Sequence, residues 1–158
     1  MTYSVAVERR VEAPQEQVWR ALTDLESMPR VLSGVEAVEI LAHAPQGGFG
    51  VGTRWRETRK MMGKQATEEM TVTASAPPTR YVVEARSHGS HYVSEFALRP
   101  EGPDATTVRM TFSAVPTGGA AKLMAKLLGR LGARAVSKAI AGDLADVAAA
   151  VEGRQRGA

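Results

Sequence analysis

The sequence contains no cysteine and few aromatic residues. With a cysteine count of 0, the chain can form no disulfide, hold no metal through thiolates and use no thiolate nucleophile. The absence of cysteine does not by itself decide the compartment. Aromatic residues make up only 5% of the chain, so each large ring is informative about packing or binding.

Long apolar runs are also missing. The first ten residues, MTYSVAVERR, carry charges and no apolar block as long as a signal peptide or a membrane span, so we expect a cytoplasmic protein. At 158 residues the chain can build one core, and we expect one domain over residues 1–152 with a flexible tail at 153–158. The net charge of +3 and pI of about 9.5 allow acidic partners but demand none.

The N-terminal part changes its apolar period. Apolar residues alternate in YSVAVERRVEA, as a half-buried strand requires. From Pro14 onward the apolar spacing is helical, and Pro29 is expected to end or bend that helix because its ring removes a donor. A second short helix is predicted around residues 30–32.

Period-two alternation returns between residues 35 and 115, interrupted by turn-rich stretches. Six strands are predicted there: Val35–Leu41, Thr53–Met61, Ala66–Ala74, Tyr81–Arg86, His91–Arg99 and Thr106–Val115. Short connections favour an antiparallel meander, and the N-terminal strand makes it a seven-stranded curved sheet.

Residues 120–152 contain no proline and repeat apolar residues every three to five positions. This pattern predicts a long amphipathic helix, with a bend near Gly129–Gly132 because glycine weakens a helix locally. The order of strand, two helices, six strands and long helix defines an α+β chain.

That order resembles the helix-grip fold of the START and birch-pollen-allergen (SRPBCC) superfamily, in which a curved antiparallel sheet wraps around a long C-terminal helix. VEAPQEQVWRALTDLESMPR is similar to the first strand and helix pair of its polyketide cyclase/dehydrase-like branch. GVGTRWRETRKMMGKQATEEMTVTASAPPTRYVVEA resembles the second hairpin and Pro-Pro turn of that branch. The resemblance implies a cavity between sheet and helix. Similar proteins include lipid carriers and aromatase/cyclases.

The strand Thr53–Met61 has two contrasting faces. Trp55, Glu57 and Arg59 share one face, whereas the other face is almost wholly cationic. The Trp55 face should therefore look inward and bring Glu57 into or near the cavity. There Glu57 either pairs with an arginine or is solvated at the rim, or it acts as a general acid or base.

The apolar faces of the other strands and of the long helix supply the expected lining. The ligand-binding candidates are Trp55, Glu57, Met70, Tyr81, Tyr92, Ser94, Phe96, Met110, Phe112, Met124, Leu127 and Leu131. Methionine side chains adapt to ligands as readily as to gaps in a core, and a few hydroxyls are suited to orienting a ligand. Ordinary core packing is the alternative for any of these residues. Substituting Trp55→Ala is expected to weaken ligand retention more than folding.

Proton transfer would require an acid or a base, and the candidates are Glu57, Tyr92 and His91. His88 and His91 form an HxxH pattern, but on a straight strand they point to opposite faces, and no third ligand completes a metal site. We expect no metal and no cofactor. No phosphate-binding loop, dinucleotide-binding fingerprint or serine-hydrolase motif is present in the sequence.

Basic residues recur every four positions along the predicted long helix. This basic ridge consists of Lys122, Lys126, Arg130, Arg134 and Lys138. It is either the solvated back of the helix or a surface for an anionic membrane or a partner protein. Nucleic acid is not expected, since no aromatic residues are interleaved with the basic ones.

These sequence features lead to three hypotheses about function. The preferred one is noncovalent binding of a hydrophobic or amphipathic, lipid- or polyketide-like small molecule. The alternatives are a cyclase or dehydratase that uses the same cavity, and an interaction module that uses the basic ridge.

Overall fold

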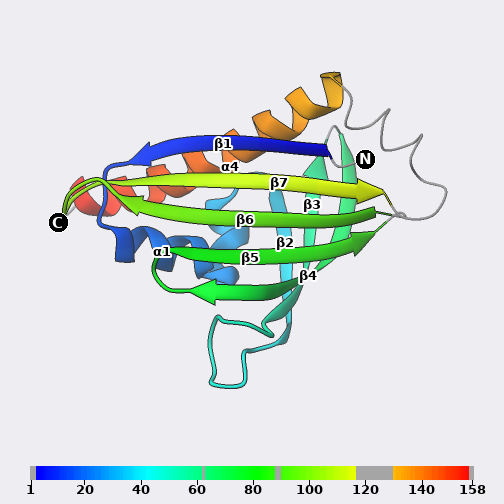
Figure 1. Cartoon of the computed structure of the whole chain (residues 1–158), viewed down its shortest axis with the longest axis horizontal. Helices are drawn as coiled ribbons and strands as arrows, with labels where there is room; N and C mark the ends of the chain where they lie inside the picture. The colour runs from blue at the N-terminus through cyan, green and yellow to red at the C-terminus, as the bar shows by residue number, and fades with distance from the viewer. Residues whose placement is uncertain (1–2, 62, 88–89, 117–129, 157–158) are drawn as a thin grey trace.

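Seven antiparallel strands and a long C-terminal helix make up the protein (Figure 1). The computed structural model describes residues 3–61, 63–87, 90–116 and 130–156. The strands are β1 (Tyr3–Val11), β2 (Val35–Ala42), β3 (Arg54–Met61), β4 (Lys64–Ala76), β5 (Arg80–Ser87), β6 (Ser90–Pro100) and β7 (Thr106–Pro116). The helical elements are α1 (Gln15–Thr23), the 3-10 turn η1 (Leu25–Ser27), α2 (Met28–Val31) and α4 (Arg130–Arg156).

The sheet order is β1-β7-β6-β5-β4-β3-β2, so consecutive strands from β2 to β7 are neighbours and β1 completes the far edge. This arrangement confirms the predicted α+β helix-grip fold. Figure 1 shows α4 lying across one face of the sheet, where it contacts β1 and α1. We call the face that α4 covers the inner face and the opposite one the outer face.

The first helix is shorter than expected. Pro14 precedes α1 with extended backbone (φ −60°, ψ 149°), as a proline at a helix start allows. The helix already ends at Thr23, and Pro29 lies in the first turn of α2, where its missing N–H breaks no hydrogen bond. The prediction that Pro29 ends or bends the first helix is therefore wrong. Pro29 instead begins the second helix, which covers Met28–Val31.

The core forms where α4 packs on the sheet and on α1. Ile140, Leu144, Val147 and Val151 recur along α4 and are all buried. They share one hydrophobic cluster with buried residues of β1, α1, β6 and β7. Burying a side chain of this size stabilises the folded chain by roughly 1.5–3 kcal/mol, which fixes α4 against this part of the sheet.

The C-terminal region can be compared only in part with its prediction. Residues 117–129, which hold Met124, Leu127 and the first residue of the expected bend, lie outside the described residues. The described part of α4 begins at Arg130 and continues to Arg156. Helical backbone thus covers residues 153–156, for which a tail was expected.

Candidate functional site

The register of the strands arranges the inner-face side chains in rows across the sheet. Three successive rows contain Trp55, Met70, Ala85 and Tyr92, then Val72, Val83, Ser94 and Phe112, then Tyr81, Phe96 and Met110. Residues directly opposite each other on antiparallel strands share a face. The lining candidates on β3 to β7 therefore point to one side of the sheet. Whether they contact a ligand stays a prediction.

Burial separates these candidates into two groups. Trp55 and Tyr81 are each 3% exposed and, with Met110, belong to the hydrophobic core. The half-buried group comprises Met70, Tyr92, Ser94, Phe96 and Phe112. The apolar surface that intramolecular packing leaves partly uncovered thus belongs to the second group.

The burial of Trp55 changes what its substitution measures. Truncating a core tryptophan to alanine costs about 3–5 kcal/mol of stability. Because Trp55 is 3% exposed, Trp55→Ala would lower stability as well as ligand retention, and the two effects could not be distinguished. A half-buried residue of the same face is the better probe.

Aromatic rings gather on the inner face. Tyr92 stacks on Phe112 with ring centroids 5.6 Å apart, and Tyr81 stacks on Phe96 at 4.6 Å. Offset stacking of this kind adds roughly 0.5–1.5 kcal/mol beyond the area buried. Most of the chain's few aromatic residues therefore meet their neighbours on this side of the sheet.

A buried ionic cluster lies beside Trp55 and joins β3 to α4. Arg59 donates from both terminal nitrogens to Asp143, at 3.0 and 2.8 Å, and from Nε to Oε2 of Glu57 at 3.3 Å. The indole N–H of Trp55 donates to the other oxygen of Glu57 at 3.5 Å. The sequence alternative in which Glu57 pairs with an arginine is the one observed, although Glu57 is only 8% exposed.

Burial and charge act in opposite directions in this cluster. Burial raises the pKa of Asp143 above its ordinary value, although the Arg59 guanidinium works against that rise. Burial alone would lower the pKa of Arg59, but the carboxylates of Asp143 and Glu57 outweigh it and raise the pKa. Arg59 therefore remains a cation that two carboxylates share.

The charges of carboxylates on the same face act on two tyrosine hydroxyls. Burial raises the pKa of Tyr81, and the charge of Glu57 adds to that rise. Burial also raises the pKa of Tyr92; a hydrogen bond with Ser90 opposes that rise, and the charge of Glu68 adds to it. Both phenols therefore keep their protons at neutral pH and are available as hydrogen-bond donors.

His91 lies on the outer face. It is opposite Arg86 in the register, and its Nε2 is 2.6 Å from Oε1 of Glu84. Hydrogen bonds from Thr73 and from His91 hold the pKa of Glu84 below its ordinary value. The structure thus separates His91 from the inner-face candidates Glu57 and Tyr92. His88 lies outside the described residues.

Two aromatic residues extend the inner-face cluster in a way that sequence reasoning missed. Trp19 of α1 and Phe49 of the β2–β3 loop meet the ring of Tyr81 edge-on, with centroids 5.3 and 5.1 Å away. Phe49 stands alone in the glycine-rich stretch QGGFGVG. In a chain with few aromatic residues, a phenylalanine in such a loop was the sequence feature that could have indicated a role in packing. Asp143 lies on α4, at a separation of 84 residues from Arg59, and no local sequence pattern indicated that the two side chains would pair.

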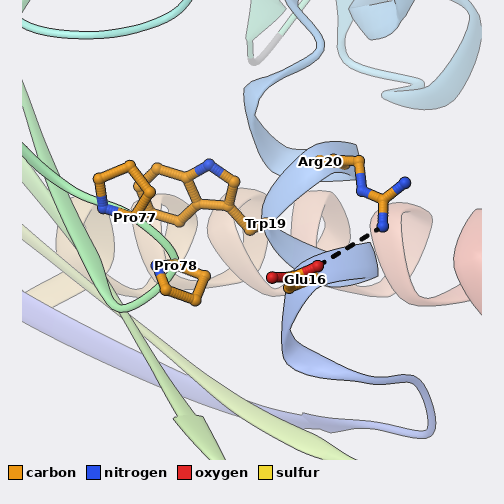
Figure 2. A pocket seen from close by; sticks show the side chains of 5 residues that line it. All are labelled: Glu16, Trp19, Arg20, Pro77 and Pro78. Atoms are coloured by element: carbon orange, nitrogen blue, oxygen red, sulfur yellow. Dashed lines mark ion pairs between the residues drawn. The ribbon is translucent and has the colours of Figure 1, made fainter.

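Trp19 also borders a small surface hollow of about 280 Å³. Its lining residues are Glu16, Trp19, Arg20, Pro77 and Pro78. Figure 2 shows the indole of Trp19 beside the two prolines, whereas Glu16 and Arg20 pair with each other on α1. The hollow therefore lies between α1 and the β4–β5 turn. It is not lined by the candidates on the inner face.

The remaining predicted sites are only partly described. Arg134 and Lys138 of the basic ridge are exposed on α4, and Lys122 and Lys126 lie outside the described residues. The side chains of Arg130 and Leu131 are likewise not described. In the described ranges, no group of three or more His, Asp or Glu side chains is arranged to hold a metal ion. No helix of the described residues is long and apolar enough to cross a membrane.

Solved structures define the class of the fold. A protein from Thermus thermophilus, TTHA0849, is 24% identical with a TM-score of 0.78, covering 96% of this chain and 98% of that one. The Zhui aromatase/cyclase from Streptomyces is 18% identical with a TM-score of 0.81, covering 98% and 96%. A START superfamily protein from Mycobacterium smegmatis is 20% identical with a TM-score of 0.70, covering 89% and 95%. These likenesses establish the START-like helix-grip fold.

Comparison of the sequence with protein-family models then assigns the chain to a family. A family model described as "Polyketide cyclase / dehydrase and lipid transport" matches residues 2–152. The chain belongs to this family, as the resemblance in its sequence implied. No curated protein matches the sequence. The family description joins cyclase enzymes with lipid transport, and both activities require a site for a largely apolar molecule.

Proposed function

We propose that this chain is a cytoplasmic protein that binds a hydrophobic or amphipathic small molecule noncovalently between the inner face and α4. The half-buried apolar surface formed by Met70, Tyr92 and Phe112 carries this proposal. Such a surface costs free energy while it faces water, and a largely apolar ligand would remove it from water. The family description, which includes lipid transport, supports the same reading.

The expected contacts fall into three groups. Met70, Ser94, Phe96 and Phe112 are proposed to contact the ligand together with Tyr92. Trp55, Tyr81 and Met110 are proposed to support that wall from the core, with Glu57 at its polar end. Met124, Leu127 and Leu131 remain proposed for the helix side on the sequence pattern alone.

The test compares two positions on opposite faces of the sheet. Native mass spectrometry of gently purified protein, followed by denaturation, identifies any small molecule that copurifies. Phe112→Ala should then weaken binding of that molecule, or of a neutral fluorescent probe such as N-phenyl-1-naphthylamine, by about tenfold, because one ring contact is lost. Val93→Ala is the control, since Val93 is opposite Glu84 on the outer face. Equal binding by both variants would contradict the proposed wall.

A cyclase or dehydratase activity is the second candidate. It is favoured by the family description and by the buried carboxylate of Glu57, whose charge acts on the phenol of Tyr81. A positioned acid or base gives a bell-shaped dependence of rate on pH. If Glu57 transfers a proton, Glu57→Gln should flatten one limb of that profile. An unchanged profile would exclude Glu57 from proton transfer.

A surface role for the basic ridge is the third candidate, and the exposure of Arg134 and Lys138 supports it. Charge reversal at both positions should abolish cosedimentation with anionic vesicles at low salt. Charge reversal at Arg56, which is paired with Glu39 on the outer face, is the control. Cosedimentation that ignores the ridge variants would remove this candidate.

A further inference from the structure

The polar end of the inner face contains more carboxylates than guanidinium groups. Glu68 of β4 is directly opposite Glu57 of β3, so both carboxylates lie on the inner face. Arg59 is already bonded to Glu57 and to Asp143. Like charges directly opposite each other on a sheet destabilise it. The described inner face therefore carries negative charge at this end that its own residues do not neutralise.

Glu68 and Glu69 make a natural comparison because they are adjacent and point to opposite faces. Glu69, on the outer face, forms an ion pair with Arg54 at 3.1 Å. Glu68 is half-buried, and among the described residues it has neither an ion pair nor a hydrogen bond. The carboxylate that lacks a partner is thus the one on the inner face.

A buried hydroxyl lies on the same face and interacts with the phenol of Tyr92. Ser90 is 2% exposed, and within the described residues its Oγ has no partner at full hydrogen-bond geometry, although it interacts with the phenol of Tyr92 and acts to lower the pKa of that phenol. It precedes Tyr92 by two residues on β6, so both side chains point to the inner face. A serine hydroxyl can donate one hydrogen bond and accept two, so a contact with Tyr92 leaves Ser90 capacity for a hydrogen-bonding group of a ligand.

The neighbouring aromatic pair is suited to a cation as well as to an alkyl chain. The ring of Tyr92 stacks on Phe112, and the charge of Glu68 acts on the phenol of Tyr92. Ring faces attract ammonium groups through their quadrupole, and the attraction grows when the cation is desolvated. A carboxylate on the same face as an aromatic pair, with its charge acting on one of the two rings, therefore forms a complementary environment for an ammonium group.

We propose that the ligand is an amphiphile with a cationic, hydrogen-bond-donating head, such as an alkylammonium, whose head lies beside Glu68, Tyr92 and Ser90. Its apolar part would then extend along Phe112. This inference rests on the proposed function, since it specifies which ligand the same inner face takes. A carboxylate or phosphate head is disfavoured there because Arg59 is already shared by two carboxylates. Arg9, a further arginine on the inner face of the described strands, lies at the opposite end beside Val108.

The test uses two amphiphiles with the same alkyl chain, dodecylammonium and dodecanoate, below their micelle concentrations. Each displaces N-phenyl-1-naphthylamine from the full chain at neutral pH and low salt. The net charge of +3 would by itself favour the anion, so a preference for the cation reports the local environment. We expect dodecylammonium to bind about tenfold more tightly than dodecanoate, a preference that salt reduces.

The two adjacent glutamates supply the matched variants. Glu68→Gln should reduce the preference by about threefold or more, whereas Glu69→Gln, which changes the net charge equally, should leave it unchanged. Urea unfolding confirms that both variants are folded. Equal effects of the two variants, or tighter binding of dodecanoate to the unaltered chain, would overturn the inference and leave the proposed function standing. Failure of both amphiphiles to displace a bound probe would overturn the inference alone, whereas failure of the probe itself to bind would overturn both.

Discussion

Replacing Arg59 by methionine should destabilise the protein strongly, because it leaves two carboxylates without their cation. The side chains of Arg59, Glu57 and Asp143 are 19%, 10% and 28% exposed. Removing one partner of a fully buried ion pair costs roughly 3–5 kcal/mol. Since these groups keep some contact with solvent, we expect a loss of about 3 kcal/mol, at the lower end of that range.

The assay is urea unfolding followed by tryptophan fluorescence, with Arg56→Met as the control. Arg56 lies on the outer face of the same strand and pairs with Glu39, and the two side chains are 45% and 65% exposed. A solvent-exposed pair contributes about 0–1 kcal/mol, so this variant should unfold close to the unaltered protein. For a chain of this size, a loss of 3 kcal/mol corresponds to a fall in Tm of roughly 6–12 °C.

A double variant tests the physical reason. Adding Asp143→Asn to Arg59→Met removes one of the two unpaired carboxylates, so it should recover about 1 kcal/mol. A loss in Arg59→Met no larger than in Arg56→Met would refute the reasoning. So would a double variant that is less stable than Arg59→Met alone.

Three further predictions follow from single contacts. Thr106, which is 0% exposed, donates to the carbonyl of Ala13, so Thr106→Val should cost about 1–2 kcal/mol in urea unfolding, and Thr106→Ser should cost less. Because burial raises the pKa of Asp143 above 3.8, the folded state takes up this proton before the unfolded state does. Unaltered protein should therefore gain stability relative to Asp143→Asn as the pH falls through that raised pKa, and a difference that does not vary with pH would argue against this. Gly52 has a φ of 98°, so Gly52→Ala should lower the unfolding free energy by about 1 kcal/mol, and an unchanged urea midpoint would contradict the strain.

The fold was predictable because it depends on local patterns. A period of two followed by short turns determines which strands are neighbours, and the helical period marks the segment that covers them. The contrast between the two faces of β3 correctly placed Trp55 and Glu57 on the inside, where they are 3% and 8% exposed. The role of Pro29 was predicted wrongly because a proline in the sequence is compatible both with the end of one helix and with the start of the next.

The candidate site was less predictable because it depends on how distant elements dock. Alternation gives Trp55 and Phe112 the same inward direction, yet only Trp55 is in the buried core. That difference depends on which side chains of other elements cover each residue. The pairing of Arg59 with Asp143 likewise requires α4 to lie against β3, and no spacing within either segment encodes it.

The distribution of charge on the two faces supports the proposal that a ligand binds at the polar end of the inner face. On the outer face, Arg54, Arg80 and Arg109 are each paired with a glutamate of a neighbouring strand. Such pairs arise easily at an exposed surface, where they contribute little to stability. On the inner face, Glu68 has no partner among the residues that the structure describes and lies opposite Glu57, although uncompensated charge is more costly in partly buried surroundings. These three outer-face arginines are thus paired, whereas the inner-face charge of Glu68, which is more costly to leave unpaired, has no partner within the described ranges. Functional sites are where such departures from local consistency are expected. The carboxylate of Glu68 is therefore the position at which the nature of the ligand is best tested.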